Sequence, residues 1–239
     1  MKVAIIFIGT SKYLDFLPLY WDKVEHNFLP GVEKTIFAFT DGEVPDAPSN
    51  VRVVKETHKP WPYITLLRFE TINMVRDELS EYDYLVFMDA DTLVVDTITE
   101  EEFVTDKPLF GVHHPCHYMN MSPHNELPGA YEPNENSEAY FNVFEAKPEV
   151  YYQGCFWGGK IPEVFDMMDT IIARTRKDLD NDIVALWHDE THINKYFNEN
   201  KDLVHTFGPE YAYPELFRDS CNFPERIVHL AKDNSRYQT

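Results

Sequence analysis

Residues 84–91, with the sequence YLVFMDAD, are the stretch that most directly indicates the fold of this chain. Five apolar or aromatic side chains in a row are typical of a strand buried on both faces, as in a parallel sheet. Asp89 and Asp91 follow at once, and residues i and i+2 of an extended chain point to the same side. We therefore expect both carboxylates at the carboxyl edge of the sheet, where open α/β sheets bind ligands.

The rest of the chain alternates between strand and helix patterns around this stretch. Continuous apolar runs indicate buried strands, and apolar residues at helical spacing indicate helices. The β-α-β-β-α-β order predicts an α/β fold with a mostly parallel sheet and helices on its faces. The expected elements are strand 3–8, helix 13–28, strands 35–39 and 51–56, helix 62–79, strand 84–89, helices 162–179 and 189–199, and a closing strand with the sequence IVHLA at 227–231.

A long segment without periodicity lies between the two halves of this pattern. Residues 119–148 are rich in Pro, Asn, Glu and Ser, and loops of this length in compact domains are usually functional lids or mobile. No repeat or linker separates independent cores, so we expect a single domain over residues 1–239.

Composition excludes several classes of partner. The chain has 41 acidic and 21 basic side chains and a net charge of −20, which disfavours nucleic acid and anionic membranes. Its three cysteines are too few for a disulfide framework and fit a reducing compartment. The apolar run at 3–8 is too short for a signal peptide or a spanning helix of about 20 residues. We therefore expect a cytoplasmic protein with no integral membrane segment.

Asp89 and Asp91 admit two interpretations. Two carboxylates at a sheet edge can hold a hard divalent cation, whose other positions take water and diphosphate oxygens. Such a cation would let an acidic protein bind a nucleotide diphosphate. Alternatively, aspartates after a strand form turns and cap helices, and residues 97–102 do resemble a capped helix.

Residues 187–197, WHDETHINKYF, are the second concentration of reactive side chains. His188 and His192 have the i, i+4 spacing of a zinc-binding helix, but Asp189 stands where the pattern H-E-x-x-H requires glutamate. Asp189 and Glu190 would also stabilise the first turn of a helix through its dipole. A third interpretation is a carboxylate beside an aromatic ring in a sugar-binding cleft, where it stabilises oxocarbenium-like charge or attacks the anomeric carbon.

Several segments in the same order resemble glycosyltransferase family 6, which includes the blood-group A and B transferases and the α-1,3-galactosyltransferases. WHDETHINKYF is the most specific of them. The matching segments are FIGTSKY (7–13), FAFTDG (37–42), WPYITLLRFE (61–70), YDYLVFMDADTLV (82–94), PLFGVHHPCHY (108–118), YYQGCFWGG (151–159), WHDETHINKYF (187–197), GPEYAYPE (208–215) and AKDNSRYQT (231–239).

The resemblance implies a GT-A glycosyltransferase fold built on a Rossmann-like sheet. It also implies that galactose or N-acetylgalactosamine moves from its UDP form to the 3-hydroxyl of a β-galactoside, with or without fucose, and keeps its anomeric configuration. On this basis the loop at 119–148 belongs to the acceptor side, and residues 231–239 form a tail that closes over the diphosphate.

The resemblance assigns roles to individual residues. Asp89 and Asp91 match the pair that holds Mn²⁺, with Mg²⁺ as the alternative, together with the donor. Glu190 matches the acid proposed as nucleophile or as electrostatic stabiliser. The other matches are Phe7, Ile8 and Tyr13 for uridine, Arg68 and Asp189 for the donor sugar, Gln153, Gly154 and Cys155 for donor choice, Lys232 and Arg236 for the diphosphate, and His114 and Trp187, beside Glu190, for the acceptor.

The departures from the family pattern are also informative. The sequence given has no membrane anchor or stem, which implies a bacterial or viral type working in the cytoplasm. It keeps both acids that some bacterial members replace with asparagine, so we expect metal dependence. Two other functions stay open on the residues alone, namely a zinc hydrolase using His188 and His192, and a non-catalytic sugar-binding module.

Overall fold

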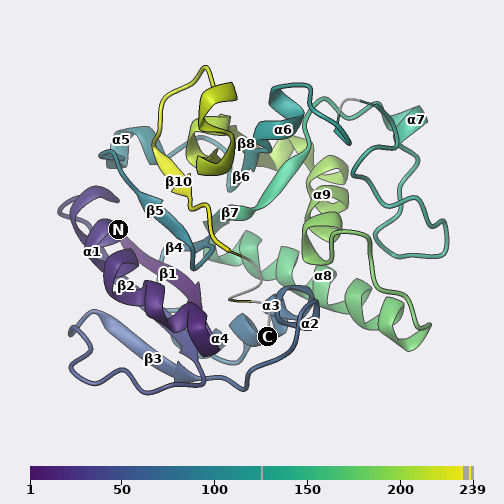
Figure 1. The fold of residues 1–239 in the computed structure, drawn as a ribbon. Helices are drawn as coiled ribbons and strands as arrows, with labels where there is room; N and C mark the ends of the chain where they lie inside the picture. Colours follow the sequence, from purple (N-terminus) through teal and green to yellow (C-terminus); the bar gives the residue numbers. More distant parts are fainter. Residues whose placement is uncertain (125, 234–236, 238–239) are drawn as a thin grey trace.

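The computed structural model describes residues 1–124, 126–233 and 237, and its centre is a seven-stranded sheet (Figure 1). The strand order is β3-β2-β1-β4-β7-β6-β8. β7 pairs antiparallel with both of its neighbours, and the other pairs in this sheet are parallel. The predicted α/β class with a mostly parallel sheet is confirmed. The strands are β1 (Lys2–Ile8), β2 (Glu33–Thr40), β3 (Val51–Lys55), β4 (Tyr84–Met88), β6 (Leu109–His113), β7 (Tyr152–Lys160) and β8 (Val204–Phe207).

Alternate side chains of β1 enter two different cores, one on each face of the sheet. Ile5 and its neighbours on one face pack with α1 (Leu17–Asn27). Ile6 packs on the other face with α3 (Arg68–Asn73) and α8 (Ile161–Asp180), which lie across the sheet from α1 in Figure 1. Full burial of one such side chain stabilises the fold by about 1.5–3 kcal/mol, so the apolar run specifies a central strand.

Two expected helices are interrupted. The helix expected at 13–28 begins as a 3₁₀ helix, η1 (Ser11–Phe16), and α1 starts at Leu17 with a proline in its first turn, where proline is favoured. The single helix expected at 62–79 is wrong. Leu67 and Val75 leave helical dihedral angles (φ −99°, ψ 13° and φ −117°, ψ 25°), so α2 (Tyr63–Leu66), α3 and α4 (Arg76–Leu79) follow one another. β-Branching lowers the helix propensity of Val75, whereas the break at Leu67 lies between buried neighbours and reflects tertiary packing.

The helices expected at 162–179 and 189–199 are confirmed as α8 and α9 (Asp189–Glu199). The closing strand is β10 (Ile227–His229), which lies in a second sheet of order β5-β10-β9. The remaining elements are β5 (Thr92–Val94), α5 (Glu100–Phe103), α6 (Pro115–Tyr118), α7 (Val143–Ala146), η2 (Lys201–Leu203), η3 (Pro209–Ala212), β9 (Tyr213–Pro214) and η4 (Glu215–Ser220).

Buried carboxylates tie part of the segment 119–148 to the helices beside it. Asp178 on α8 accepts hydrogen bonds from the Ser137 hydroxyl and the Glu138 amide, each at 2.6 Å. Glu132 accepts one from the Leu186 amide, also at 2.6 Å. These contacts hold residues 132–138 beside the residues that lead into α9. Mobility of the segment and the single domain over 1–239 stay predictions.

Within the described residues, every helix is too short or too polar to cross a membrane.

Candidate active site

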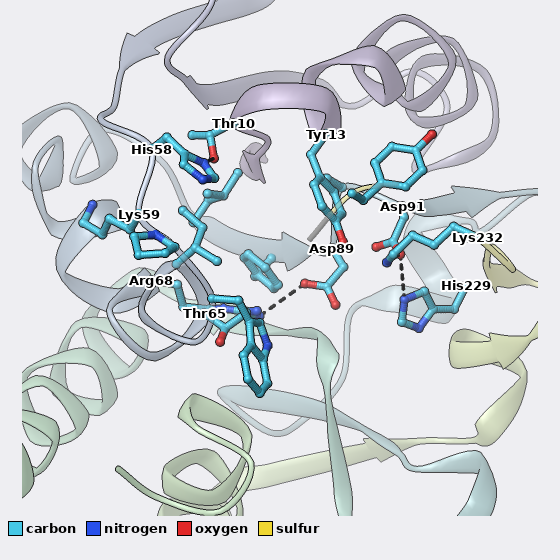
Figure 2. Close-up of a pocket in the computed structure, with 17 residues that line it drawn as sticks. Thr10, Tyr13, His58, Lys59, Thr65, Arg68, Asp89, Asp91, His229 and Lys232 are labelled. Carbon is cyan, nitrogen blue, oxygen red and sulfur yellow. Dashed lines mark hydrogen bonds and ion pairs between the residues drawn. The ribbon is translucent and has the colours of Figure 1, made fainter. Parts of the chain in front are cut away.

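A cavity of about 490 Å³ lies at the carboxyl edge of β1 and β4, where the sequence placed the site (Figure 2). The ends of these strands, the segment 58–68 and the chain after β10 converge on it. Ligands of α/β sheets bind at this edge because the polar loops that follow the strands meet there. Its polar lining includes Thr10, Tyr13, His58, Lys59, Thr65, Arg68, Asp89, Asp91, His229 and Lys232.

Asp91 is the most strongly charge-paired carboxylate of the cavity. It is buried, its Oδ2 lies 3.1 Å from Nε2 of His229, and Nζ of Lys232 also contacts this oxygen. Burial alone would raise the pKa of Asp91, but the charges and hydrogen bonds of His229 and Lys232 outweigh it and hold that pKa below its ordinary value. The carboxylate is therefore ionised throughout the physiological range.

Asp89, Asp91 and His229 together form a candidate metal centre. Each offers one ligand atom, and these atoms lie within 4.8 Å of one another. Two carboxylate oxygens and an imidazole nitrogen suit a first-row cation such as Mn²⁺, and the open cavity leaves positions for phosphate oxygens. The residues thus fit the metal that the acidic pair predicted.

Sequence reasoning missed His229. It lies 138 residues from Asp91, and no short motif connects the two. The available signal was a histidine at the end of the apolar strand IVH, next to the basic tail.

Arg68 connects the acidic pair to α9. Its buried guanidinium lies 3.3 Å from Asp89 Oδ1 through Nη1 and 2.9 Å from Asp189 Oδ2 through Nε. Nη1 also donates to the Gly154 carbonyl at 2.9 Å, and the group stacks over the Phe87 ring at 4.3 Å. A single cation therefore holds together residues that are far apart in the chain.

Glu190 lies in the first turn of α9 with both carboxylate oxygens hydrogen-bonded. Tyr151 donates its hydroxyl to Oε1 and Gly154 its backbone N–H to Oε2, each at 2.8 Å. Burial raises the pKa of Glu190 to about 7, although these two hydrogen bonds oppose the shift. Burial likewise raises the pKa of the neighbouring Asp189 to about 7, against the attraction of Arg68. Groups with such pKa values are typical of functional sites.

Gly154 has a steric reason to be glycine. A Cβ atom at this position would lie 3.3 Å from Cβ of Glu190, closer than most real contacts of this kind. The missing side chain lets the strand approach α9 closely enough for the N–H of Gly154 to reach the carboxylate.

The profile of glycosyltransferase family 6 matches residues 1–237. The chain belongs to this family. Family membership confirms the resemblance seen in the sequence and implies the GT-A fold, consistent with the sheet described above. A metal site of acidic residues, as at Asp89 and Asp91, also accords with a family that typically uses a divalent metal.

Named relatives of this family 6 chain come from bacteria and animals. It is 30% identical over 239 residues to the O-antigen biosynthesis glycosyltransferase WbnI of Escherichia coli, and this match covers 99% of this chain and 97% of that protein. It is 28% identical over 238 residues to the histo-blood group ABO system transferase 2 of Rattus norvegicus, a match that covers 96% of this chain and 68% of that protein. It is 26% identical over 226 residues to the globoside alpha-1,3-N-acetylgalactosaminyltransferase 1 of Homo sapiens, a match that covers 90% of this chain and 62% of that protein.

Of the residues predicted to bind uridine and diphosphate, some line the cavity and others do not. Ile8 and Tyr13 line the cavity, but Phe7 is fully buried in the core, so its ring does not line the cavity. Nζ of Lys232 lies 5.0 Å from the centre of the Tyr13 ring. Arg236 lies outside the described residues.

The predicted donor-choice residues differ in accessibility. Gln153 is half-buried, and its Nε2 lies 3.4 Å from Nδ1 of His229. Cys155 is buried in the core. The Gln153 side chain thus contacts the candidate metal centre, and the backbone of Gly154 contacts Arg68 and Glu190.

The predicted acceptor residues lie near Glu190: the Trp187 carbonyl accepts from the Glu190 amide at 3.1 Å, and the His114 ring lies 5.7 Å from the ring of Tyr151, which contacts Glu190. Trp187 is 44% exposed and precedes α9. His114 caps α6, with Nδ1 accepting from the Cys116 amide at 3.1 Å. Burial and neighbouring histidines lower the pKa of His114 well below its ordinary value, so the ring is neutral at neutral pH.

His188 and His192 do not form a zinc site. Nδ1 of His188 lies 3.3 Å from the Thr65 hydroxyl, near the cavity. His192 is fully buried, with Nε2 3.6 Å from Asp178. Among the described residues, the candidate metal-ligating group consists of Asp89, Asp91 and His229 and contains neither of these two histidines. The zinc-hydrolase alternative therefore has no support in the structure.

Proposed function

We propose that the protein is a metal-dependent, retaining hexosyltransferase. It moves galactose or N-acetylgalactosamine from its UDP form to the 3-hydroxyl of a β-galactoside, with or without fucose, and forms an α-1,3 linkage. The observation that carries this proposal is that Arg68 joins the carboxylate of the candidate metal centre, Asp89, to the acidic pair that opens α9. That arrangement, in a family 6 chain, lies at the point where a diphosphate would leave and a sugar would be transferred.

On the donor side, the residues supply positive charge and an aromatic surface. Asp89, Asp91 and His229 would hold Mn²⁺, with Mg²⁺ as the alternative, and the cation would neutralise charge on the departing diphosphate. Lys232 contacts Asp91 and therefore lies beside the candidate metal centre. From there it would add a charge-assisted hydrogen bond to a diphosphate held by the cation. Tyr13 presents its ring to uracil at the end of the cavity that Ile8 also lines.

On the other side, Glu190 acts on the anomeric carbon. Its ionised carboxylate either attacks that carbon, in a double displacement, or stabilises positive charge while the acceptor enters on the same face. Both alternatives require Glu190 without its proton. Trp187 and His114 bind the galactoside, and Asp189, held by Arg68, contacts the donor sugar.

The test is to incubate the protein with Mn²⁺, each UDP-sugar in turn, and lactose or a fucosylated galactoside. We expect UDP release and a product whose new linkage is α-1,3 by NMR, with both abolished by a chelator. Absence of transfer and of UDP release with every pair would contradict the proposal. Galactoside binding without UDP release, together with a UDP affinity that does not rise with Mn²⁺, would instead favour the sugar-binding module, which has no use for the nucleotide. The cytoplasmic location and the absence of nucleic-acid partners stay predictions.

A further inference from the structure

Tyr151 is a buried side chain to which the sequence assigned no role, although it contacts the proposed catalytic residue directly. It immediately precedes β7 and has 0% of its surface exposed. Its hydroxyl lies 2.8 Å from Glu190 Oε1, and the other oxygen of Glu190 is held by a backbone amide. Two hydrogen-bond donors thus fix the plane of this carboxylate, the backbone N–H of Gly154 and the side-chain hydroxyl of Tyr151.

The ring of Tyr151 is held by the acceptor-side residues. The Tyr131 ring packs edge-on at 4.9 Å, the His124 ring lies at 5.0 Å and the His114 ring at 5.7 Å between centroids. The hydroxyl also lies 3.3 Å from the Ala130 carbonyl. A change in the position of these residues would therefore be transmitted to Glu190 through one rigid side chain.

The hydroxyl has a single proton and two acceptors within reach. The shorter contact, to Glu190, is also the charge-assisted one when Glu190 is ionised, so the proton points there. When Glu190 is neutral, the hydroxyl can instead donate to the Ala130 carbonyl. Burial, and then the charge of Glu190, raise the pKa of Tyr151 well above its ordinary value, so it remains a donor throughout the working range.

We propose that Tyr151 is a positioning residue that orients the ionised carboxylate of Glu190 and couples it to the acceptor-side residues around Ala130. The proposal rests on the proposed function, since it concerns the acid assigned to the transfer step. It predicts that the hydroxyl matters for turnover, whereas the ring matters for folding.

The test is Tyr151→Phe, with Tyr152→Phe as the matched control. Tyr152 is the next residue, is also buried, and donates or accepts one hydroxyl hydrogen bond, to Thr206 at 2.9 Å, away from the cavity. We expect kcat to fall about 10- to 100-fold in Tyr151→Phe, the effect of one hydrogen bond to a charged group, with KM for donor and acceptor nearly unchanged. Unchanged UDP affinity would show that the variant is folded.

The pH profile adds a readout that a purely structural role would not move. Without its hydroxyl donor, the pKa of Glu190 rises further, so the acid limb of kcat/KM moves to higher pH in Tyr151→Phe only. Apart from Tyr151 itself, the charged and titratable groups that face Glu190 are unaltered in both variants. They are Arg68 on α3, Asp89 after β4, Asp189 on α9, Cys155 on β7 and Cys116 on α6.

A direct titration separates this proposal from the proposed function. The ¹³C carboxyl resonance of Glu190 is assigned by its loss in Glu190→Gln and is then titrated in the parent protein and both tyrosine variants. The positioning role alone is overturned if the parent enzyme transfers sugar but Tyr151→Phe changes neither kcat nor the titration of Glu190. It is also overturned if Tyr152→Phe changes these two quantities as much as Tyr151→Phe does. If the parent enzyme transfers no sugar, the proposed function fails, and the titration still decides whether Tyr151 controls the carboxylate.

Discussion

Two carboxylates linked through Arg68 and its partner Asp89, namely Asp91 at the cavity and Glu190 in the first turn of α9, differ in their pKa values. Asp91 is paired with Lys232 and, when no metal is bound, with the protonated ring of His229, and its pKa is held low. Glu190 has hydrogen bonds but, among the residues that the structure describes, no ion pair with a cation, and burial raises its pKa to about 7. The difference shows that the charges and hydrogen bonds of two partners outweigh burial at Asp91, whereas two neutral hydrogen-bond donors at Glu190, or the single ion pair of Asp189 with Arg68, do not. Asp91 is thereby suited to bind a cation, and Glu190 can gain or lose a proton near neutral pH.

The largest expected effect is a loss of turnover when the charge of Glu190 is removed. Glu190→Gln keeps the shape and one accepting oxygen, which the Gly154 N–H requires, but turns the other position into a donor and removes the charge. We therefore expect turnover to fall about 10³-fold, with UDP and Mn²⁺ affinity little changed. Steady-state kinetics and calorimetric titration with UDP measure the two quantities. Glu199→Gln, at the other end of α9 in an exposed ion pair with Arg174, is the control. Turnover within about tenfold of the parent enzyme would remove Glu190 from the transfer step.

A smaller effect is expected when the metal side is altered at His229. His229→Gln should weaken Mn²⁺ binding about 10- to 100-fold, measured by electron paramagnetic resonance with UDP present. Activity lost at low Mn²⁺ should return at high Mn²⁺, which Glu190→Gln does not permit. His205→Gln on β8, outside the cavity, is the control. Unchanged Mn²⁺ affinity in His229→Gln would exclude this histidine from the metal centre and leave Asp89 and Asp91 as the ligands.

The smallest effect concerns stability. The pKa values of Asp189 and Glu190 are about 7 in the folded protein, above ordinary values of 3.8 and 4.5, so the folded state binds more protons between these limits. The free energy of unfolding therefore falls as pH rises from about 5 to 8 on account of these two groups. Glu190→Gln should flatten this dependence in thermal melts, where 1 kcal/mol corresponds to roughly 2–4 °C. An identical pH dependence in the variant would contradict the raised pKa of Glu190.

Much of this architecture could be predicted because its causes are local. The apolar run before Asp89 specifies a central strand, and the i, i+2 spacing brings both aspartates to its edge. Helix α9 is confirmed within its expected bounds. The single helix expected at 62–79 was wrong because burial on both sides of Leu67 outweighs helix propensity, which differs by only a fraction of a kcal/mol among ordinary residues.

The amino-acid sequence by itself determined the class of fold, the family and the two acidic pairs, because short-range spacing and side-chain chemistry carry that information. Only the tertiary structure decided that His229 joins Asp89 and Asp91, that Arg68 links them to α9, and that Tyr151 holds Glu190. These are contacts between residues far apart in the chain. Their strength depends on burial and on which charges share a cavity, and neither quantity exists until the chain has folded.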